Sequence, residues 1–198
     1  MNEAGPRSNG PLIEARGLNK NFGPIPALAG VDLELAGGQV IGLLGENGCG
    51  KTTLLKVLAG VMQDHAGRVR IAGRRLGPGT KACVSFLPDA SYLKDSATVS
   101  QCIGMFSDFF SDFRADKASD MIKFFGLAEN MKLKQMSKGM REKAQIALAM
   151  SRDAKVFLLD EPISGVDPAA RDVILKGIVR NLEADALVLI STHLIHDL

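Results

Sequence analysis

The sequence predicts an α/β fold with a mainly parallel sheet, and two observations carry this prediction. Short apolar runs alternate along the chain with segments of helical periodicity, which is typical of strands joined by crossover helices. The runs 40–44, 156–159 and 186–190 contain no charged residue. Such runs are expected of parallel strands that are covered on both faces.

The other elements are predicted from shorter patterns. Residues 31–35 alternate between apolar and acidic side chains, which predicts a half-buried strand. Pro168 suits the first turn of a helix over 168–182, because the N–H that proline lacks is not needed there. Further strands are expected at 12–18, 69–71 and 83–87, and an amphipathic helix is expected from the spacing of Leu54, Leu55, Leu58 and Val61.

Composition limits the class of protein. Of the 198 residues, 46% are hydrophobic and 23% are charged, as in an ordinary globular domain. The formal net charge of +2 is too small to indicate a nucleic-acid binder, so no nucleic-acid partner is expected. The 3 cysteines lack zinc-binding spacing and fit a reducing compartment. Residues 1–11, rich in Gly, Pro, Asn and Ser, are expected to form a flexible tail.

From about 98 to 150 the strand patterns vanish, and phenylalanine and methionine recur at helical intervals. This change predicts a helical subdomain inserted between two strands of the sheet. Its phenylalanines either fill the core of the insert, which we favour for most of them, or form a docking surface. They are Phe106, Phe109, Phe110, Phe113, Phe124 and Phe125.

The glycine-rich segment 45–52 matches the pattern GxxxxGK[ST] and lies between a buried strand and an amphipathic helix. Glycine lets the backbone curl so that its N–H groups surround an anion, and the helix N-terminus adds positive charge. Lys51 can reach the β- and γ-phosphates of a nucleotide, and the Thr52 hydroxyl can ligate Mg²⁺. The predicted phosphate contacts are Gly45, Glu46, Asn47, Gly48, Cys49, Gly50, Lys51, Thr52 and Thr53.

Two carboxylates and a histidine follow other buried strands. Asp160 and Glu161 come directly after the run 156–159, and ligands of α/β sheets bind at the carboxyl ends of strands. We expect Asp160 to hold Mg²⁺ and Glu161 to polarise the attacking water as general base. His193 is either a structural histidine or a contact of the γ-phosphate or the water. The predicted catalytic residues are thus Lys51, Glu161 and His193.

Further motifs narrow the choice among phosphate-loop proteins. The segment 136–141, Met-Ser-Lys-Gly-Met-Arg, resembles the LSGGQ signature loop of ABC ATPases. The segment 164–167, which ends at Asp167, resembles their D-loop, and His193 resembles their switch histidine. Phe22 resembles the aromatic residue that stacks on adenine, and the alternative is a core residue near a Gly-Pro turn. The motifs occur in the order of the family and extend the resemblance from about residue 12 to the last residue.

The resemblance implies a P-loop NTPase core with a small N-terminal antiparallel β part and an inserted helical subdomain, over residues 12–198. It also implies an ATP-binding subunit that hydrolyses ATP with Mg²⁺ between two head-to-tail nucleotide-binding domains, identical or different. In the family, the closing and opening of this pair of domains drives a transmembrane partner from the cytoplasmic face of the membrane. The signature residues that would cap the γ-phosphate bound by the other subunit are Ser137, Lys138, Gly139 and Met140.

Three positions depart from the family pattern. Lys138 replaces the first glycine of the signature, and Met140 replaces its glutamine. Asp89 stands where the Q-loop glutamine is usual. Its carboxylate is a predicted Mg²⁺ ligand, although Pro88 and Asp89 could equally form a plain turn.

Two alternatives remain open, and the second is allowed by these departures. One is a soluble ABC ATPase that acts on ribosomes or DNA, and the other is a regulatory module that binds ATP without hydrolysing it. The combination of motifs most resembles that of bacterial exporter ATPases.

Overall fold

The computed structural model describes residues 10–193, which form two four-stranded sheets packed with helices. The strands are β1 (Ile13–Phe22), β2 (Ile25–Leu35), β3 (Gln39–Leu44), β4 (Ala66–Ile71), β5 (Arg74–Arg75), β6 (Val84–Leu87), β7 (Val156–Asp160) and β8 (Leu187–Thr192). The helices are α1 (Lys51–Leu58), α2 (Pro78–Lys81), α3 (Val99–Phe109), α4 (Ala115–Phe124), the 3₁₀ turn η1 (Leu133–Gln135), α5 (Lys138–Met150) and α6 (Pro168–Arg180).

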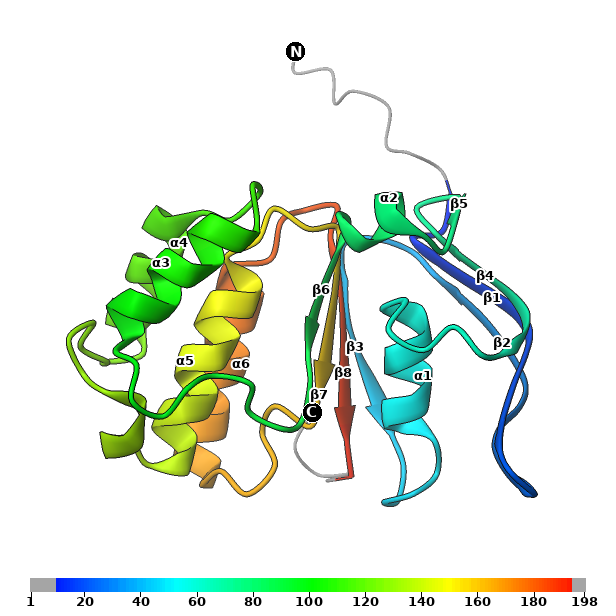
Figure 1. Cartoon of the computed structure of the whole chain (residues 1–198), viewed down its shortest axis with the longest axis horizontal. Coiled ribbons are helices and arrows are strands. Elements are labelled where there is room, and N and C mark those ends of the chain that lie inside the picture. The colour runs from blue at the N-terminus through cyan, green and yellow to red at the C-terminus, as the bar shows by residue number, and fades with distance from the viewer. Residues whose placement is uncertain (1–9, 194–198) are drawn as a thin grey trace, which may run out of the picture.

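The two sheets lie in separate layers. One is antiparallel in the order β2-β1-β4-β5, and the other is parallel in the order β3-β8-β7-β6. Figure 1 shows the parallel sheet between the helical layer α3–α6 on one side and α1 on the other, with the antiparallel sheet outside α1. The predicted fold class is therefore confirmed, including the antiparallel β part and the helical insert.

The parallel strands bring their carboxyl ends to one edge of the sheet, which is the lower edge in Figure 1. The register pairs Leu44 with Thr192 and Asp160 with Ser191. The segments that follow β3, β7 and β8 therefore begin side by side. These are the segments that carry the phosphate loop, the acidic pair and the final histidine.

Two apolar cores lie on opposite faces of the parallel sheet. Along β7, Leu158 packs into the core shared with α1 and the antiparallel sheet, whereas Phe157 and Leu159 pack against the helical layer. Covering on both faces explains why this strand carries no charged residue before its end. The helical insert has no separate core among the described residues, because its buried side chains join those of β7, β8 and α6 in one cluster.

Two details of the prediction are wrong. β3 was expected to be covered on both faces, but Val40 and Leu44 are 37% and 47% exposed. β3 pairs only with β8 among the described strands, and the helical layer covers the neighbouring strands instead. Val61 does not continue the apolar face of α1 and is 63% exposed, since the helix ends at Leu58 and the chain turns away at a left-handed Gly60 with φ 68°.

The phenylalanines of the insert divide between core and surface. Phe106 is buried, and its ring centroid lies 5.5 Å from that of Phe110 and 5.4 Å from that of Phe113. Phe125 is also buried. Phe109 is 78% exposed, so the apolar pattern of the insert exceeds what its core needs. No helix within residues 10–193 is long and apolar enough to cross a bilayer.

A buried arginine joins the insert to the parallel sheet. Arg152 follows α5, is 8% exposed, and donates from Nη2 to the Asp112 carboxylate at 2.8 Å. Its Nη1 donates to the Val84 carbonyl of β6 at 2.9 Å, and its guanidinium lies 4.3 Å from the centroid of the Phe110 ring. One planar cation thus connects the loop after α3, the first residue of β6 and the aromatic cluster.

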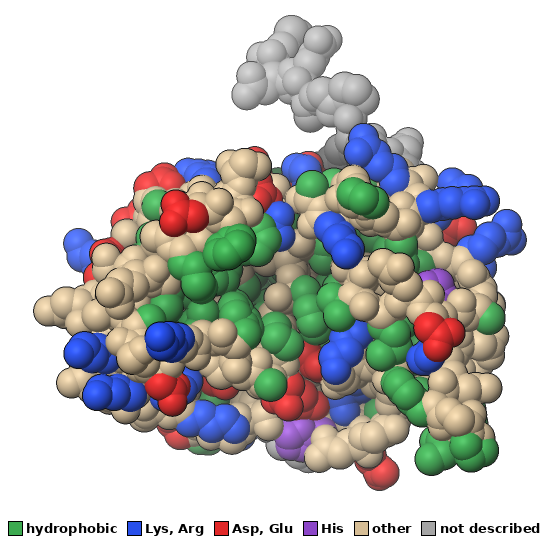
Figure 2. All heavy atoms as spheres, viewed as in Figure 1, with side chains coloured by type: hydrophobic (Ala, Val, Ile, Leu, Met, Phe, Trp, Pro, Cys, Tyr) green, Lys and Arg blue, Asp and Glu red, His purple; other side chains and the backbone are tan. Residues whose placement is uncertain are grey.

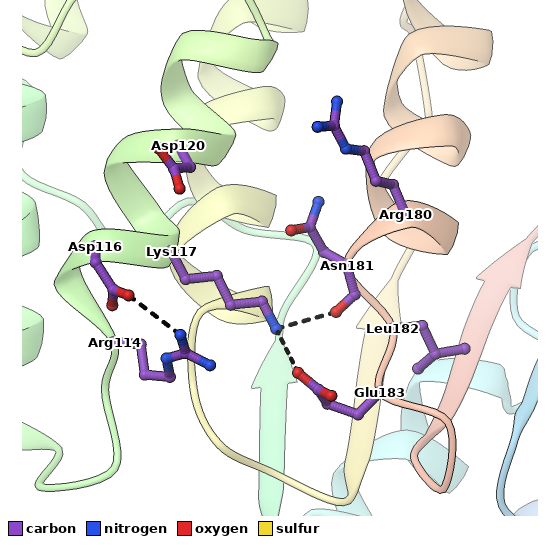
Figure 3. Close-up of a pocket in the computed structure, with 8 residues that line it drawn as sticks. All are labelled: Arg114, Asp116, Lys117, Asp120, Arg180, Asn181, Leu182 and Glu183. Carbon is purple, nitrogen blue, oxygen red and sulfur yellow. Dashed lines mark hydrogen bonds and ion pairs between the residues drawn. The ribbon is translucent and has the colours of Figure 1, made fainter.

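A second charged junction joins α4 to the end of α6, as Figure 3 shows. Lys117 donates to the carbonyl of Asn181 at 3.0 Å, and its Nζ lies 3.8 Å from the Glu183 carboxylate. Arg114 pairs with Asp116 at 3.1 Å in the same hollow of about 270 Å³. A cation at the C-terminus of a helix satisfies its free carbonyls, so this hollow is explained by packing between helices.

Candidate nucleotide site

Glycines shape the phosphate loop, and the helix that follows it has no side chain capping its N-terminus. Gly48 and Gly50 have φ values of 84° and 97°, which side chains disfavour. A Cβ at Gly50 would lie 2.3 Å from the Ala27 carbonyl oxygen of β2, so this position also requires the smallest residue. Gly50 precedes α1 and has no side chain to cap it. The first N–H groups of the helix therefore remain available to an anion.

Lys51 is held inside the loop rather than in solvent. It is 7% exposed, and its Nζ donates to the carbonyls of Gly45 at 2.6 Å and Glu46 at 3.0 Å. The same nitrogen lies 3.4 Å from Oε1 of Glu161. The other loop residues, Glu46, Asn47, Gly48 and Cys49, are exposed. A single cation thus sits where the loop, the helix and the acidic pair meet.

Asp160 is buried at the carboxyl end of β7, with 1% of its surface exposed. Its Oδ1 accepts hydrogen bonds from the hydroxyls of Thr52 at 3.1 Å and Ser191 at 2.7 Å. Its Oδ2 is also buried and has no hydrogen-bond partner in the described structure. A buried carboxylate oxygen without a partner is costly. Together with the Thr52 hydroxyl it forms an oxygen donor set that suits Mg²⁺.

Glu161 lies between a lysine and a histidine. Its side chain is 11% exposed, its Oε2 lies 2.8 Å from Nδ1 of His193, and its Oε1 faces Lys51. The backbone of Glu161 has φ 50° and donates its N–H to the Ser191 hydroxyl at 2.9 Å. A non-glycine residue in this conformation is strained and is found preferentially at functional sites.

The structure therefore brings together most residues of the predicted phosphate and metal site. Ser191 was missed, although it links Asp160 to the backbone of Glu161. The available signal was a hydroxyl at the end of an otherwise apolar strand, which is aligned with Asp160 in the neighbouring strand. The residues that meet here are Lys51, Thr52, Asp160, Glu161 and His193.

The signature segment lies elsewhere on the same edge. Ser137 caps α5 by accepting the N–H of Met140 at 3.3 Å, so the simple capping role is present. Gly139 lies in the first turn of the helix, and the Lys138 ammonium lies 2.7 Å from the place of a Cβ on Gly165. In Figure 1 the start of α5 and the start of α1 lie at the same lower end but on opposite sides of the sheet.

Asp167, the predicted D-loop residue, caps α6. Its side chain accepts the N–H of Ala170 at 3.0 Å, and Pro168 follows it at the first helical position. The N-termini of α5 and α6 therefore both carry a capped first turn at the edge of the sheet that holds the phosphate loop.

Asp89 lies in the exposed loop after β6, and its charge acts on Glu142 in α5. Burial, together with the Asp89 carboxylate, raises the pKa of Glu142 in α5 to about 7, although Lys138 and Arg141 lower it. Gln145, one turn later, donates to Glu142 at 3.4 Å and keeps a buried Oε1 without a partner. The Asp89 carboxylate thus lies close enough to the Glu142 carboxyl group to repel its negative charge.

This pair yields a prediction for the pH dependence of stability. The pKa of Glu142 is higher in the folded chain than its usual 4.5, so between these values the folded chain binds more protons than the unfolded chain. Stability therefore falls as the pH rises from about 4.5 to about 7. Because Glu142 is only partly buried, solvent screening reduces the effect of the shift. We expect Glu142→Gln to raise the free energy of unfolding by about 1–2 kcal/mol at pH 8, and much less at pH 5.

The measurement is urea denaturation at both pH values, with Glu129→Gln on the surface as the control. An equal effect of Glu142→Gln at pH 5 and pH 8 would contradict the assignment.

Phe22 lies at the turn between β1 and β2 and is 49% exposed. The Lys20 ammonium lies 5.0 Å from the centroid of its ring. The hairpin is connected to the phosphate loop because Gly50 packs against the carbonyl of Ala27 in β2. An exposed aromatic ring on a hairpin that contacts the phosphate loop is suited to stacking on a nucleobase.

The comparisons with known proteins agree with this geometry. The family model described as ABC transporter matches residues 28–164. The chain is 32% identical to the Fe(3+) ions import ATP-binding protein FbpC of Mesorhizobium japonicum, over 92% of the chain and 53% of that protein. It is 30% identical to the Nod factor export ATP-binding protein I of Ralstonia nicotianae, over 94% of the chain and 61% of that protein. The relatives that this chain resembles thus include one named for import and one named for export.

Solved structures show the same likeness. A structure described as the ATP-binding subunit of an ABC transporter is 26% identical, with a TM-score of 0.81, and the match covers 93% of this chain and 80% of that one. The chain spans between 39% and 65% of the length of the curated relatives it matches. The phosphate loop, the acidic pair and the family match together place this chain in the ABC transporter family, as its ATP-binding domain.

Proposed function

We propose that this chain binds and hydrolyses Mg–ATP at the interface of a head-to-tail pair of ABC domains, and that the resulting motion drives a transmembrane partner. The observation that carries the proposal is the meeting of Lys51, Asp160 and Glu161 beside the uncapped N-terminus of α1. A cation, a metal-binding carboxylate and a candidate base are the parts that phosphoryl transfer to water needs.

The residues that would hold Mg²⁺ are Thr52 and Asp160. The buried Oδ2 of Asp160 lacks a protein partner, and Ser191 fixes the other oxygen. When bound, Mg²⁺ supplies charge that offsets the negative charge of the β- and γ-phosphates. Asp89 is a further candidate ligand by position, because β6 pairs with β7 and their carboxyl ends adjoin.

The chain's own residues can perform the remaining steps. The N–H groups of α1 and the Lys51 ammonium grip the phosphate oxygens and stabilise the charge that grows on them. Glu161 accepts a proton from the attacking water, and His193 orients the Glu161 carboxylate through the 2.8 Å contact. When phosphate binds, the Lys51 ammonium gives up its hydrogen bonds to the carbonyls of Gly45 and Glu46 and donates to phosphate oxygens instead.

The signature segment supports a dimeric site. In Figure 1 the start of α5 lies across the sheet from the phosphate loop, so one chain does not supply both halves of a site. A second domain placed head to tail would present Ser137 and Gly139 at the N-terminus of α5 to the γ-phosphate. ATP then contacts both domains only in the closed pair, which shifts the population toward closure.

The proposed partner is a membrane protein on whose cytoplasmic face this domain docks. Figure 2 shows hydrophobic side chains gathered at the middle of one face, over the boundary between the helical layer and the parallel sheet. Apolar patches on a folded surface mark protein interfaces. In α3 and the loop before it, three large hydrophobic residues are exposed, namely Tyr92, Met105 and Phe109.

Phosphate release and cysteine labelling test the proposal together. Cys49 is exposed within the phosphate loop, so bound nucleotide should shield its thiol. At an Mg–ATP concentration ten times the Kd, maleimide labelling of Cys49 should slow about tenfold, because only the free fraction reacts. Cys83, which lies outside the loop, should label at an unchanged rate. Equal labelling of Cys49 with and without Mg–ATP, with no phosphate release, would overturn the proposal.

A further inference from the structure

We propose that Lys20 is a positioning residue for the nucleotide base: paired with Asp64, it holds the Phe22 ring and ties the β1–β2 hairpin to the loop that follows the phosphate-binding helix. The inference rests on the proposed function and adds to it a device that sets where the base binds relative to the triphosphate.

The buried state of Lys20 is the first observation. Only 8% of this side chain is exposed, although it lies on the sheet near the tip of a hairpin. Lysine is rarely buried unless its charge is paired. Its Nζ donates to Oδ2 of Asp64 at 2.8 Å, and this hydrogen bond lowers the pKa of the Asp64 carboxyl.

The ring contact is the second observation. Lys20 and Phe22 are two positions apart on β1 and share a face of the strand. The ammonium lies 5.0 Å from the centroid of the Phe22 ring, within the range of cation–π attraction. Lys20 therefore occupies one face of the ring, while 49% of Phe22 remains exposed. The exposed part of the ring is available to a planar ligand.

The position of Asp64 gives the pair its geometric effect. Asp64 lies in the loop between α1 and β4, six residues after the last residue of α1. The ion pair thus connects the hairpin to the loop that follows α1, the helix whose first turn is proposed to bind the phosphates. Gly50 makes the second connection, by packing against the Ala27 carbonyl of β2. Two contacts, one at Gly50 before α1 and one at Asp64 in the loop after it, connect the hairpin to the segments on either side of this helix.

This arrangement separates base binding from phosphate binding. Loss of Lys20 should release the Phe22 ring and the hairpin tip, while the loop and the contacts of Lys51 remain. The affinity for ATP should then fall, but the affinity for an unsubstituted triphosphate should not. A general loss of structure would weaken both ligands, so the comparison distinguishes positioning from folding.

The experiment measures binding by calorimetry for wild type, Lys20→Met, Lys20→Arg and Asp64→Asn. The two ligands are Mg–ATP and magnesium tripolyphosphate, which has no base. We expect Lys20→Met to raise the Kd of Mg–ATP about tenfold and to leave that of tripolyphosphate within about twofold. Asp64→Asn should act in the same direction but less, and Lys20→Arg should restore most of the affinity. Lys56→Met in α1 is the matched control, expected to leave both constants unchanged.

Steady-state kinetics give a second readout, in which Lys20→Met should raise KM for ATP and leave kcat unchanged. Equal weakening of both ligands, or no weakening of either, would overturn this inference alone. Wild-type protein that binds neither ligand would overturn the proposed function, and this inference with it.

Discussion

Glu161→Gln is expected to lower the turnover of ATP by about 10²–10⁴-fold while leaving Mg–ATP binding intact. The amide keeps the size of the side chain but is not a base that can accept the proton of water. It also removes a negative charge 3.4 Å from the Lys51 ammonium, so the lysine becomes freer to bind phosphate. Nucleotide-bound dimers should accumulate, because closure occurs and the step that ends it does not.

The measurements are phosphate release, calorimetry and light scattering with Mg–ATP. Glu129→Gln is the matched control, since this glutamate is exposed and lies outside the site. Turnover of ATP at the wild-type rate in Glu161→Gln would show that Glu161 is not the general base.

Arg152→Met is expected to lower the free energy of unfolding by about 3 kcal/mol or more. Methionine fills the space of the arginine stem but leaves the Asp112 carboxylate and the Val84 carbonyl without their donor. Removing one partner of a buried pair costs about 3–5 kcal/mol, because the other partner stays desolvated. Asp112 is 25% exposed, so the lower end of this range applies.

Urea denaturation measures this effect, and Arg114→Met provides the control. Arg114 forms an exposed pair with Asp116, and exposed pairs contribute little to stability because solvent screens them. If Arg152→Met were no more destabilising than Arg114→Met, the guanidinium would not be the link between the insert and β6. Asp112→Asn, which removes only the charge, should be intermediate.

The sequence predicted the class of fold because the strands of the parallel sheet are short and uniformly apolar. Phe157 and Leu158 face different cores, so neither could be polar, and the pattern shows that directly. β3 has a similar composition but an exposed face. Which strand lies at the edge of a sheet depends on pairing between distant segments, and no local pattern records it.

The candidate site was predicted from motifs to the extent that each residue follows a strand. Asp160 and Glu161 were found in this way, whereas Ser191 required the register between β7 and β8. The burial of Glu142 beside Asp89 was likewise invisible, because the two belong to α5 and to the loop after β6. The role of the signature residues in a second subunit remains a prediction, since it concerns a surface that one chain does not complete.

The way in which Lys51 is held has a thermodynamic consequence. A lysine side chain that moves freely loses up to about 2 kcal/mol of rotamer entropy when a ligand immobilises it. Here two carbonyls and a carboxylate already restrict the side chain. That entropy is lost when the chain folds, so an arriving nucleotide meets a preorganised cation and exchanges one set of oxygen partners for another.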